Sequence, residues 1–354
     1  MVIPIRQTYL LSACLLFTIS PLSDASPYPD AGTLFREHKD DSFGKQPKEN
    51  KQTPKTIKVE QATIKPELDN NELLLVTAYQ LHGNSLLSQK EVEQALKPYT
   101  NVTLSTSGIH EAATALQKAY IDKGLFAAEV IIPPQSVSNN QVILYVYEGV
   151  LAKDGVHIVN SGKRVNDDVV SSILQSNLHI GELIQSEKFE RSILLIDDLP
   201  GLAVKSSLYP GAEVGTANFL LETKDEALVS GNIDADNFGS YYTGEARLGT
   251  TIYVNSPTKN GDQLTLRLVT SGSDSNYGFV QYDFPVGGDG FRIGSSLDYL
   301  GYTLGKEFRS FDAEGSASEL HLFSSYPLIR SRHNSLQARA DLVHLALKDD
   351  NNTG

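Results

Sequence analysis

The chain has 354 residues, a length that accommodates two or three domains. Its formal net charge of −13 and its isoelectric point near 5.1 disfavour a nucleic-acid-binding protein, which would normally carry a basic patch. No stretch of about 20 apolar residues is present, which excludes a membrane-spanning helix. A closed β-barrel is then the remaining way for this chain to cross a bilayer.

Residues 1–25 have the features of a secretory signal peptide. Arg6 supplies the positive charge, residues 9–19 form the apolar core, and Ser23-Asp24-Ala25 is a small-residue cleavage site. Cleavage there would remove Cys14, the one cysteine of the chain. A lipoprotein signal ending at Cys14 is the alternative, but it is disfavoured because this cysteine lies inside the apolar run instead of ending it.

Residues 26–72 are polar and rich in proline, and they mix basic with acidic side chains. This composition predicts an exposed linker. A short piece around residues 32–39 is compatible with one or two helical turns, with Leu34 and Phe35 as its apolar contacts. We therefore interpret the segment as a linker first and as a plug helix second.

Residues 73–150 predict a compact β-α-α-β-β module. A strand over 73–81 precedes a helix that begins at the capping box Ser88-Gln89-Lys90-Glu91. A second helix ends near Gly124, and strands over 126–132 and 142–147 follow. The second helix has one apolar stripe, formed by Ile109, Ala112, Ala113, Leu116 and Tyr120.

The same order of elements repeats in residues 151–225. A strand over 156–159 is followed by a helix over 167–178 and by another that begins at Ser186. Strands over 202–209 and 217–222 close the unit. Two similar modules of about 75 residues each therefore precede the rest of the chain.

Residues 226–354 alternate between apolar and polar positions, the period of β-strands. Leu264, Leu266 and Leu268 point one way, while the residues between them point the other. Apolar faces opposite charged faces, with polar turns between, are typical of a barrel with lipid outside and water inside. We count about seven strands, the last over 336–347. The charged residues expected to line the pore are Arg247, Arg267, Arg292, Asp298, Arg339 and Asp341.

Other sites are disfavoured. The run from Asp234 to Glu245 resembles a calcium loop, but Phe238 replaces an oxygen ligand and the flanking elements are strands. Gly287-Gly288-Asp289-Gly290 is a hairpin turn and not a phosphate-binding loop, because no Lys-Ser/Thr helix follows it. We expect no metal, no cofactor, no nucleotide and no catalytic set, so the chain is not expected to be an enzyme.

Several motifs in the modules carry a resemblance to a known family. In the first module they are the run over 120–126, then Ile132-Pro133-Pro134-Gln135 and Tyr147-Glu148-Gly149; in the second, Asp197-Asp198-Leu199-Pro200-Gly201. The start of the barrel adds Asp236, Asn237, Gly239 and Asp262. Their order and spacing resemble those of two-partner secretion outer-membrane transporters, the haemolysin and filamentous-haemagglutinin secretion family. The resemblance covers roughly residues 70–347.

The resemblance implies an α+β fold joined to a membrane all-β fold: two polypeptide-transport-associated (POTRA) domains followed by a barrel. It implies an outer-membrane location with the POTRA domains in the periplasm. The implied partners are a large exoprotein in unfolded form and outer-membrane lipid or lipopolysaccharide, with no nucleic acid. Since the family's barrel has sixteen strands, we expect this chain to stop inside the barrel. The alternative function is that of the related outer-membrane protein insertion factors.

A β-α-α-β-β module offers a free strand edge beside a helix, to which an extended polypeptide can add itself. We expect Gln117, Tyr120, Phe126 and Glu129 to lie near such a client-binding groove in the first module. The alternative is that Tyr120 and Phe126 fill the core between helix and sheet.

Overall fold

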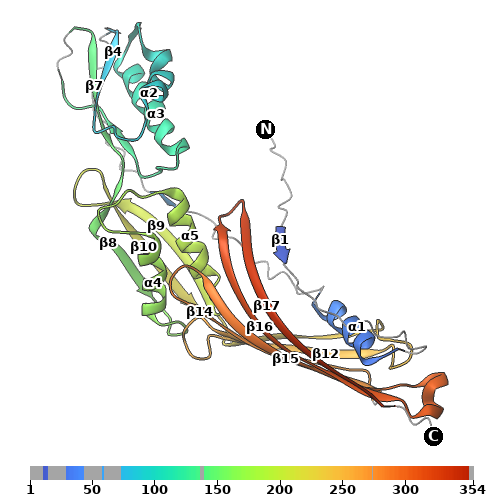
Figure 1. The fold of residues 1–354 in the computed structure, drawn as a ribbon. Helices are drawn as coiled ribbons and strands as arrows, with labels where there is room; N and C mark the ends of the chain where they lie inside the picture. The colour runs from blue at the N-terminus through green and yellow to red at the C-terminus, as the bar shows by residue number, and fades with distance from the viewer. Residues whose placement is uncertain are drawn as a thin grey trace.

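The computed structural model describes residues 11–14, 29–43, 58–59, 73–135, 139–272 and 274–350. Along the chain the first module, the second module and a large sheet follow one another in space (Figure 1). No described helix is both long and apolar enough to cross a membrane. Most of the predicted signal peptide and linker lie outside the described residues.

The first module has the two predicted helices, but its strands form two separate sheets. Two details of the sequence prediction are wrong: the strand over 73–81 is two strands in different sheets, and the strand over 126–132 is reduced to its centre. The division occurs at Thr77, whose N–H and hydroxyl both bind the carbonyl of Asn140. The elements are β3 Leu74–Val76, β4 Ala78–His82, α2 Gln89–Leu96, η1 Lys97–Tyr99, β5 Val102–Leu104, α3 Thr106–Asp122, β6 Glu129–Ile131 and β7 Gln141–Tyr147. They form the sheets β4-β7-β6 and β3-β5.

The capping box, the glycine after α3 and the apolar stripe of α3 are present in this module as predicted. The hydroxyl of Ser88 accepts the N–H of Glu91 at 3.4 Å, while the Glu91 carboxylate accepts the N–H of Ser88 at 2.8 Å, which completes the capping box. Gly124 follows α3 with φ of +90°, a backbone conformation that favours glycine. The apolar stripe of α3 is buried against the sheet, with Tyr120 and Leu116 fully inaccessible.

The second module repeats the predicted order and forms a separate core. It comprises β8 Val150–Asn160, α4 Asp167–Asn177, α5 Ser186–Asp197, β9 Leu202–Pro210 and β10 Thr216–Asp225. The sheet order is β2-β9-β10-β8, where β2 is the short segment Lys58–Val59. Helices α4 and α5 bury their apolar faces on this sheet around Phe189 and Phe219.

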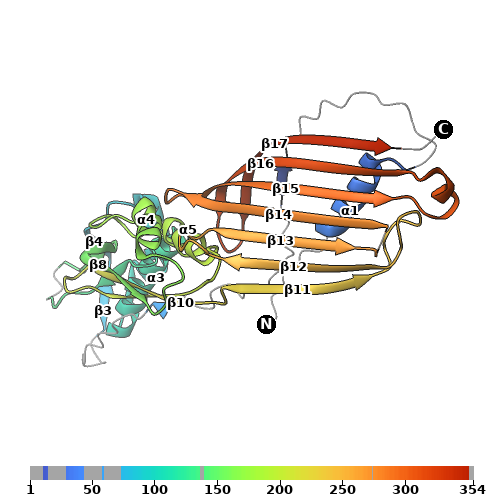
Figure 2. The same cartoon turned by 90° about the horizontal axis from the view of Figure 1, so that it is seen from below.

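The large sheet contains the seven antiparallel strands that the alternation predicts. They are β11 Val229–Asp236, β12 Arg247–Asn255, β13 Gln263–Thr270, β14 Ser275–Val286, β15 Phe291–Thr303, β16 Glu314–Arg330 and β17 Ser335–Asp350. They lie side by side in chain order, and helix α1, Ala31–Phe43, lies across one face (Figure 2). The short strand β1, Leu11–Cys14, pairs in parallel with β17.

Candidate functional site

The two faces of the large sheet differ in chemistry, and the strand register fixes which residue lies on which face. On the convex outer face, one cross-strand row joins Leu266, Val280, Leu297 and Leu320. Leu297 and Leu320 are about half exposed in the isolated chain. A contiguous row of exposed aliphatic side chains is the surface that a barrel presents to lipid.

The inner face is charged, and its charges are paired. Arg247 binds Asp236 at 2.9 Å. Arg267 lies 3.2 Å from Asp234 and also donates to the Thr251 hydroxyl at 2.7 Å. Asp236 is on the strand next to that of Arg247, whereas Asp234 is two strands away from Arg267, with Thr251 on the strand between them. These contacts therefore connect β11, β12 and β13 across the inner face.

The other residues predicted to line the pore also lie on this inner face. Arg292 lies 2.6 Å from Asp283. Asp341 accepts from Arg339 at 2.8 Å and is 2.7 Å from His321. All six predicted residues face inward, but the sequence alone did not identify Asp236, Asp234 and Asp283 as the partners of Arg247, Arg267 and Arg292.

Asp298 is almost fully buried on the inner face. It lies directly opposite Glu319 on the next strand and accepts a hydrogen bond from the Tyr277 hydroxyl at 2.5 Å. The two buried carboxylates lie close to the place where α1 crosses the sheet, since Tyr277 also contacts Phe35 of α1.

Helix α1 is docked on the inner face by a small apolar surface. Ala31, Leu34 and Phe35 are at most 2% exposed. The receiving surface is formed by residues of β13 to β16 and the loop after β15, namely Val269, Tyr277, Phe279, Leu300, Tyr302, Leu304, Ala313 and Ala317. Leu34 and Phe35 are therefore the apolar contacts that the sequence predicted, and the helix is longer than predicted.

Asp349 on β17 fixes the first turn of α1. Its carboxylate accepts the N–H of Ala31 at 2.9 Å and also accepts from the Tyr302 hydroxyl. A carboxylate at a helix N-terminus satisfies a free N–H and interacts favourably with the helix dipole. Gly32 permits close approach here, because a Cβ at this position would lie 3.2 Å from the Leu347 side chain.

The motif residues at the start of the barrel have local structural roles. The Asp262 carboxylate is fully buried and accepts from the N–H groups of Thr258 and Asn260 and from the Tyr282 hydroxyl, which holds the β12–β13 turn. Asp236 accepts the N–H of Phe238 at 3.0 Å as well as pairing with Arg247.

Gly239 and Asn237 lie in the loop after β11. A Cβ at Gly239 would meet the carbonyl oxygen of Gly244 at 2.1 Å, so only glycine fits, while Asn237 is exposed. The described residues contain no cluster of three potential metal ligands, and the calcium-loop pattern does not assemble one.

The predicted client-binding residues of the first module separate into two groups. Tyr120 is fully buried in the module's core, and its hydroxyl donates to Asn84 Oδ1 at 2.5 Å. Burial raises the pKa of the Tyr120 phenol, so it remains a hydrogen-bond donor. Phe126 packs instead on the core of the second module, 5.3 Å from the Phe189 ring. Neither side chain faces a free groove.

Gln117 and Glu129 differ from Tyr120 and Phe126 in that they lie at the surface of the first module. Both are half-buried; Gln117 is on α3, and Glu129 is on β6, which packs against α3. Strand β6 is at the end of the sheet β4-β7-β6. Its outer edge pairs with no other strand among the described residues.

Two parts of the chain match models of known protein families. Residues 74–149 match the ShlB-type POTRA domain, and residues 215–350 match the family of haemolysin secretion/activation protein ShlB/FhaC/HecB. Over the second of these stretches the chain matches a family of two-partner secretion transporters of the outer membrane, which are not enzymes. The first module corresponds to the periplasmic POTRA domain of such transporters, and the large sheet to part of their barrel.

Individual relatives are distant and longer than this chain. A heme/hemopexin transporter protein HuxB of Haemophilus influenzae is 28% identical over 76% of this chain and 47% of its own length. The outer membrane transporter CdiB of Escherichia coli is 25% identical over 65% of this chain and 36% of its own length. The chain therefore spans about half or less of these relatives.

Solved structures share the fold. CdiB from Escherichia coli superposes with a TM-score of 0.63 at 19% identity, covering 82% of this chain and 55% of that chain. CdiB from Acinetobacter baumannii gives a TM-score of 0.58 at 14% identity, covering 93% and 65%. POTRA modules followed by the first strands of a barrel are therefore the shared architecture.

Proposed function

We propose that the protein is the outer-membrane transporter of a two-partner secretion system, which moves one large, β-rich exoprotein through its barrel in unfolded form. The observation that carries this proposal is the combination of two POTRA modules with a sheet that is apolar outside and charged inside. The relatives' names support it: HuxB is a heme/hemopexin transporter and CdiB an outer membrane transporter. Folding of the client outside the cell would make its passage directional.

The inner-face charges are proposed to line the conduit. Arg247, Arg267, Arg292, Arg339 and the carboxylates Asp298 and Asp341 lie on the face that a closed barrel turns toward its lumen. Because the four arginines are already paired with carboxylates, they offer a wall that is polar but would bind an unfolded chain only weakly. An unfolded chain could slide along such a wall without being held at one point.

Helix α1 is proposed to plug the conduit at rest. It lies on the inner face, where Ala31, Leu34 and Phe35 are its buried apolar contacts among the described side chains and Asp349 accepts the N–H of Ala31. A helix of 13 residues is marginally stable alone, so undocking from the wall would also allow it to unfold. Transport would then require α1 to leave this surface.

Client capture is proposed at the β6 edge of the first module. The exposed backbone of β6 offers main-chain hydrogen bonds with little sequence demand, and Gln117 and Glu129 flank the edge. Tyr120 and Phe126 have no part in this proposal, because Tyr120 is buried in the core of the first module and Phe126 packs on the core of the second.

The test is deletion of the gene in the source bacterium, with immunoblotting of the large secreted protein encoded beside it. The proposal predicts that this protein disappears from the medium and returns on complementation. Unchanged release, combined with a general loss of outer-membrane barrels, would contradict secretion and favour the insertion-factor alternative.

A further inference from the structure

Helix α5 of the second module contacts both the first module and the barrel. Its first turn contacts the first module, the barrel contacts extend from Glu190 to Asp198, and Figure 1 shows the helix between these two bodies. An element in this position can set the orientation of the whole periplasmic arm.

The joint at the start of α5 is formed by Phe126 of the first module. Its ring packs 5.3 Å from Phe189, which in turn packs edge-on against Phe219 at 4.9 Å. The N–H of Ser186 donates to the carbonyl of Gly124 at 2.8 Å. A side chain of one module thus completes the hydrophobic core of the next.

Two ion pairs join α5 to the barrel. Arg330, where β16 ends, donates to both carboxylate oxygens of Asp198, which directly follows the helix, at 2.7 and 2.8 Å. About two turns earlier in α5, Glu190 is 3.1 Å from Arg332 Nε and also accepts the Arg332 N–H. The bidentate pair fixes direction as well as distance, which a single contact does not.

Two more turns of the barrel contact the second module. The backbone of the turn after β14 approaches α4 so closely that a Cβ at Gly288 would lie 2.3 Å from the carbonyl oxygen of Ser172. In the turn after β12, the carbonyl of Lys259 accepts the N–H of Asn166 at 2.9 Å. In the same turn after β14, the Arg191 guanidinium of α5 donates to the carbonyl of Asp289 at 3.0 Å.

We propose that Asp198, Glu190 and Phe126 are positioning residues for transport: through α5, they hold the first module at a fixed orientation to the barrel mouth. Asp198 and Glu190 fix α5 to the β16–β17 turn, while Phe126 anchors the first module to the first turn of the same helix. The effect of these residues on transport rests on the proposed secretion role. Their effect on the orientation of the first module does not.

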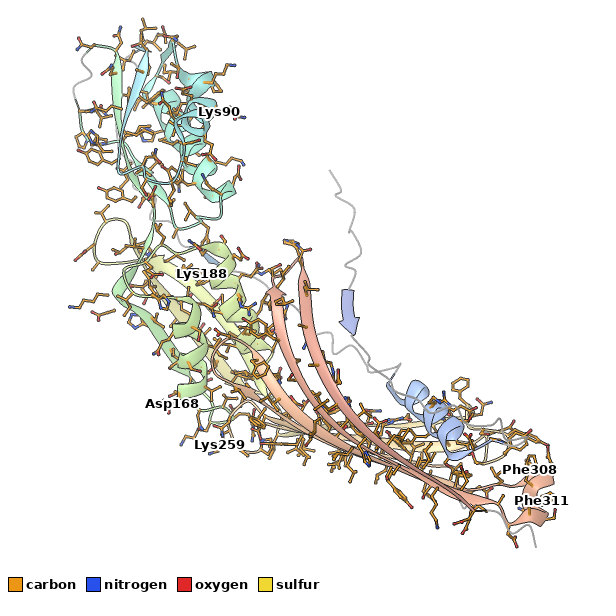
Figure 3. All side chains as sticks on the ribbon, in the orientation of Figure 1. Lys90, Asp168, Lys188, Lys259, Phe308 and Phe311 are labelled. Atoms are coloured by element: carbon orange, nitrogen blue, oxygen red, sulfur yellow. The ribbon has the colours of Figure 1, made fainter. Side chains whose placement is uncertain are left out.

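The test uses spin-label distances on the protein in outer membranes, with cysteines at the exposed positions Lys90, Lys188 and Lys259 (Figure 3). The Lys188–Lys259 pair reports on the second module against the barrel. The Lys90–Lys188 pair reports on the two modules. Both are measured without client, so they remain informative if the secretion role fails.

We expect Asp198→Arg to raise, roughly three- to tenfold, the fraction of molecules in which the second module is displaced from the barrel. These molecules should add a new component to the distribution of Lys188–Lys259 distances. The reversed pair, Asp198→Arg with Arg330→Asp, should restore the single distance. Phe126→Ala should broaden only the Lys90–Lys188 distances. Glu182→Arg, an equal charge change on an exposed loop residue, is the matched control and should alter neither.

An unchanged Lys188–Lys259 distribution in Asp198→Arg, or no recovery in the reversed pair, would overturn the ionic joint. An unchanged Lys90–Lys188 distribution in Phe126→Ala would overturn the aromatic joint. Secretion is measured on the same variants, and the proposal predicts a loss in Asp198→Arg that the reversed pair restores.

Discussion

Removing the Phe35 ring should release α1 from the inner face of the barrel. Phe35 is 2% exposed, and burial of such a side chain contributes about 1.5–3 kcal/mol. Among the side chains of α1 that the structure describes, residues 31–37, Ala31 and Leu34 would remain as fully buried apolar contacts. Because 1.36 kcal/mol corresponds to a factor of ten, Phe35→Ala should shift the docking equilibrium roughly ten- to hundredfold toward the undocked helix.

The assay is maleimide labelling of a cysteine at Ala317, which is completely buried in the cluster where α1 docks. In the Ala317→Cys background, labelling should be slow with the native helix and at least tenfold faster with Phe35→Ala. Thr33→Ala is the matched control, since Thr33 is on the exposed side of α1. Equal labelling rates for Phe35→Ala and the control would refute the docking account.

The remaining predictions concern the barrel wall and the first module. Leu297→Arg places a charge on the outer face and should cost about 2–4 kcal/mol if the site lies near the bilayer midplane, measured as reduced heat-modifiable folded protein in membranes. Tyr120→Phe should lower the free energy of unfolding by about 1 kcal/mol in denaturant melts, because Asn84 Oδ1 loses the Tyr120 hydroxyl and keeps the N–H of Leu87 as a donor. Hydrogen bonds from Ser88 lower the pKa of Glu91 to about 2. The charged Glu91 carboxylate therefore contributes its full stabilisation above the ordinary glutamate pKa, and this stabilisation is lost as the pH falls toward 2. The difference in free energy of unfolding between the native protein and Glu91→Gln should vanish between these two pH values.

The faces of the large sheet could be predicted from the sequence because a strand has a side-chain period of two. Leu264, Leu266 and Leu268 share the outer face as expected, and the register then follows from short hairpin turns. The capping box at Ser88 and the glycine at Gly124 are likewise local signals whose geometry needs no distant partner.

Long-range contacts could not be predicted in the same way. The N–H of Ala31 binds Asp349, 318 residues away, and no local pattern links the two. Phe126 has the same apolar character whether it fills its own module or the next, so the sequence could not decide between those cores. The short strand β5 was missed because three residues carry too little periodicity to be recognised.

The most direct test of the transport account is site-specific photo-crosslinking of the exoprotein during secretion. Gln281 and Val280 are consecutive residues of β14 on opposite faces of the sheet, so a crosslinker at each samples the lumen and the lipid at one depth. The account predicts a crosslink to the exoprotein from Gln281 and none from Val280. Equal crosslinking from both positions, or none from Gln281 while the exoprotein is being released, would contradict passage along this inner face.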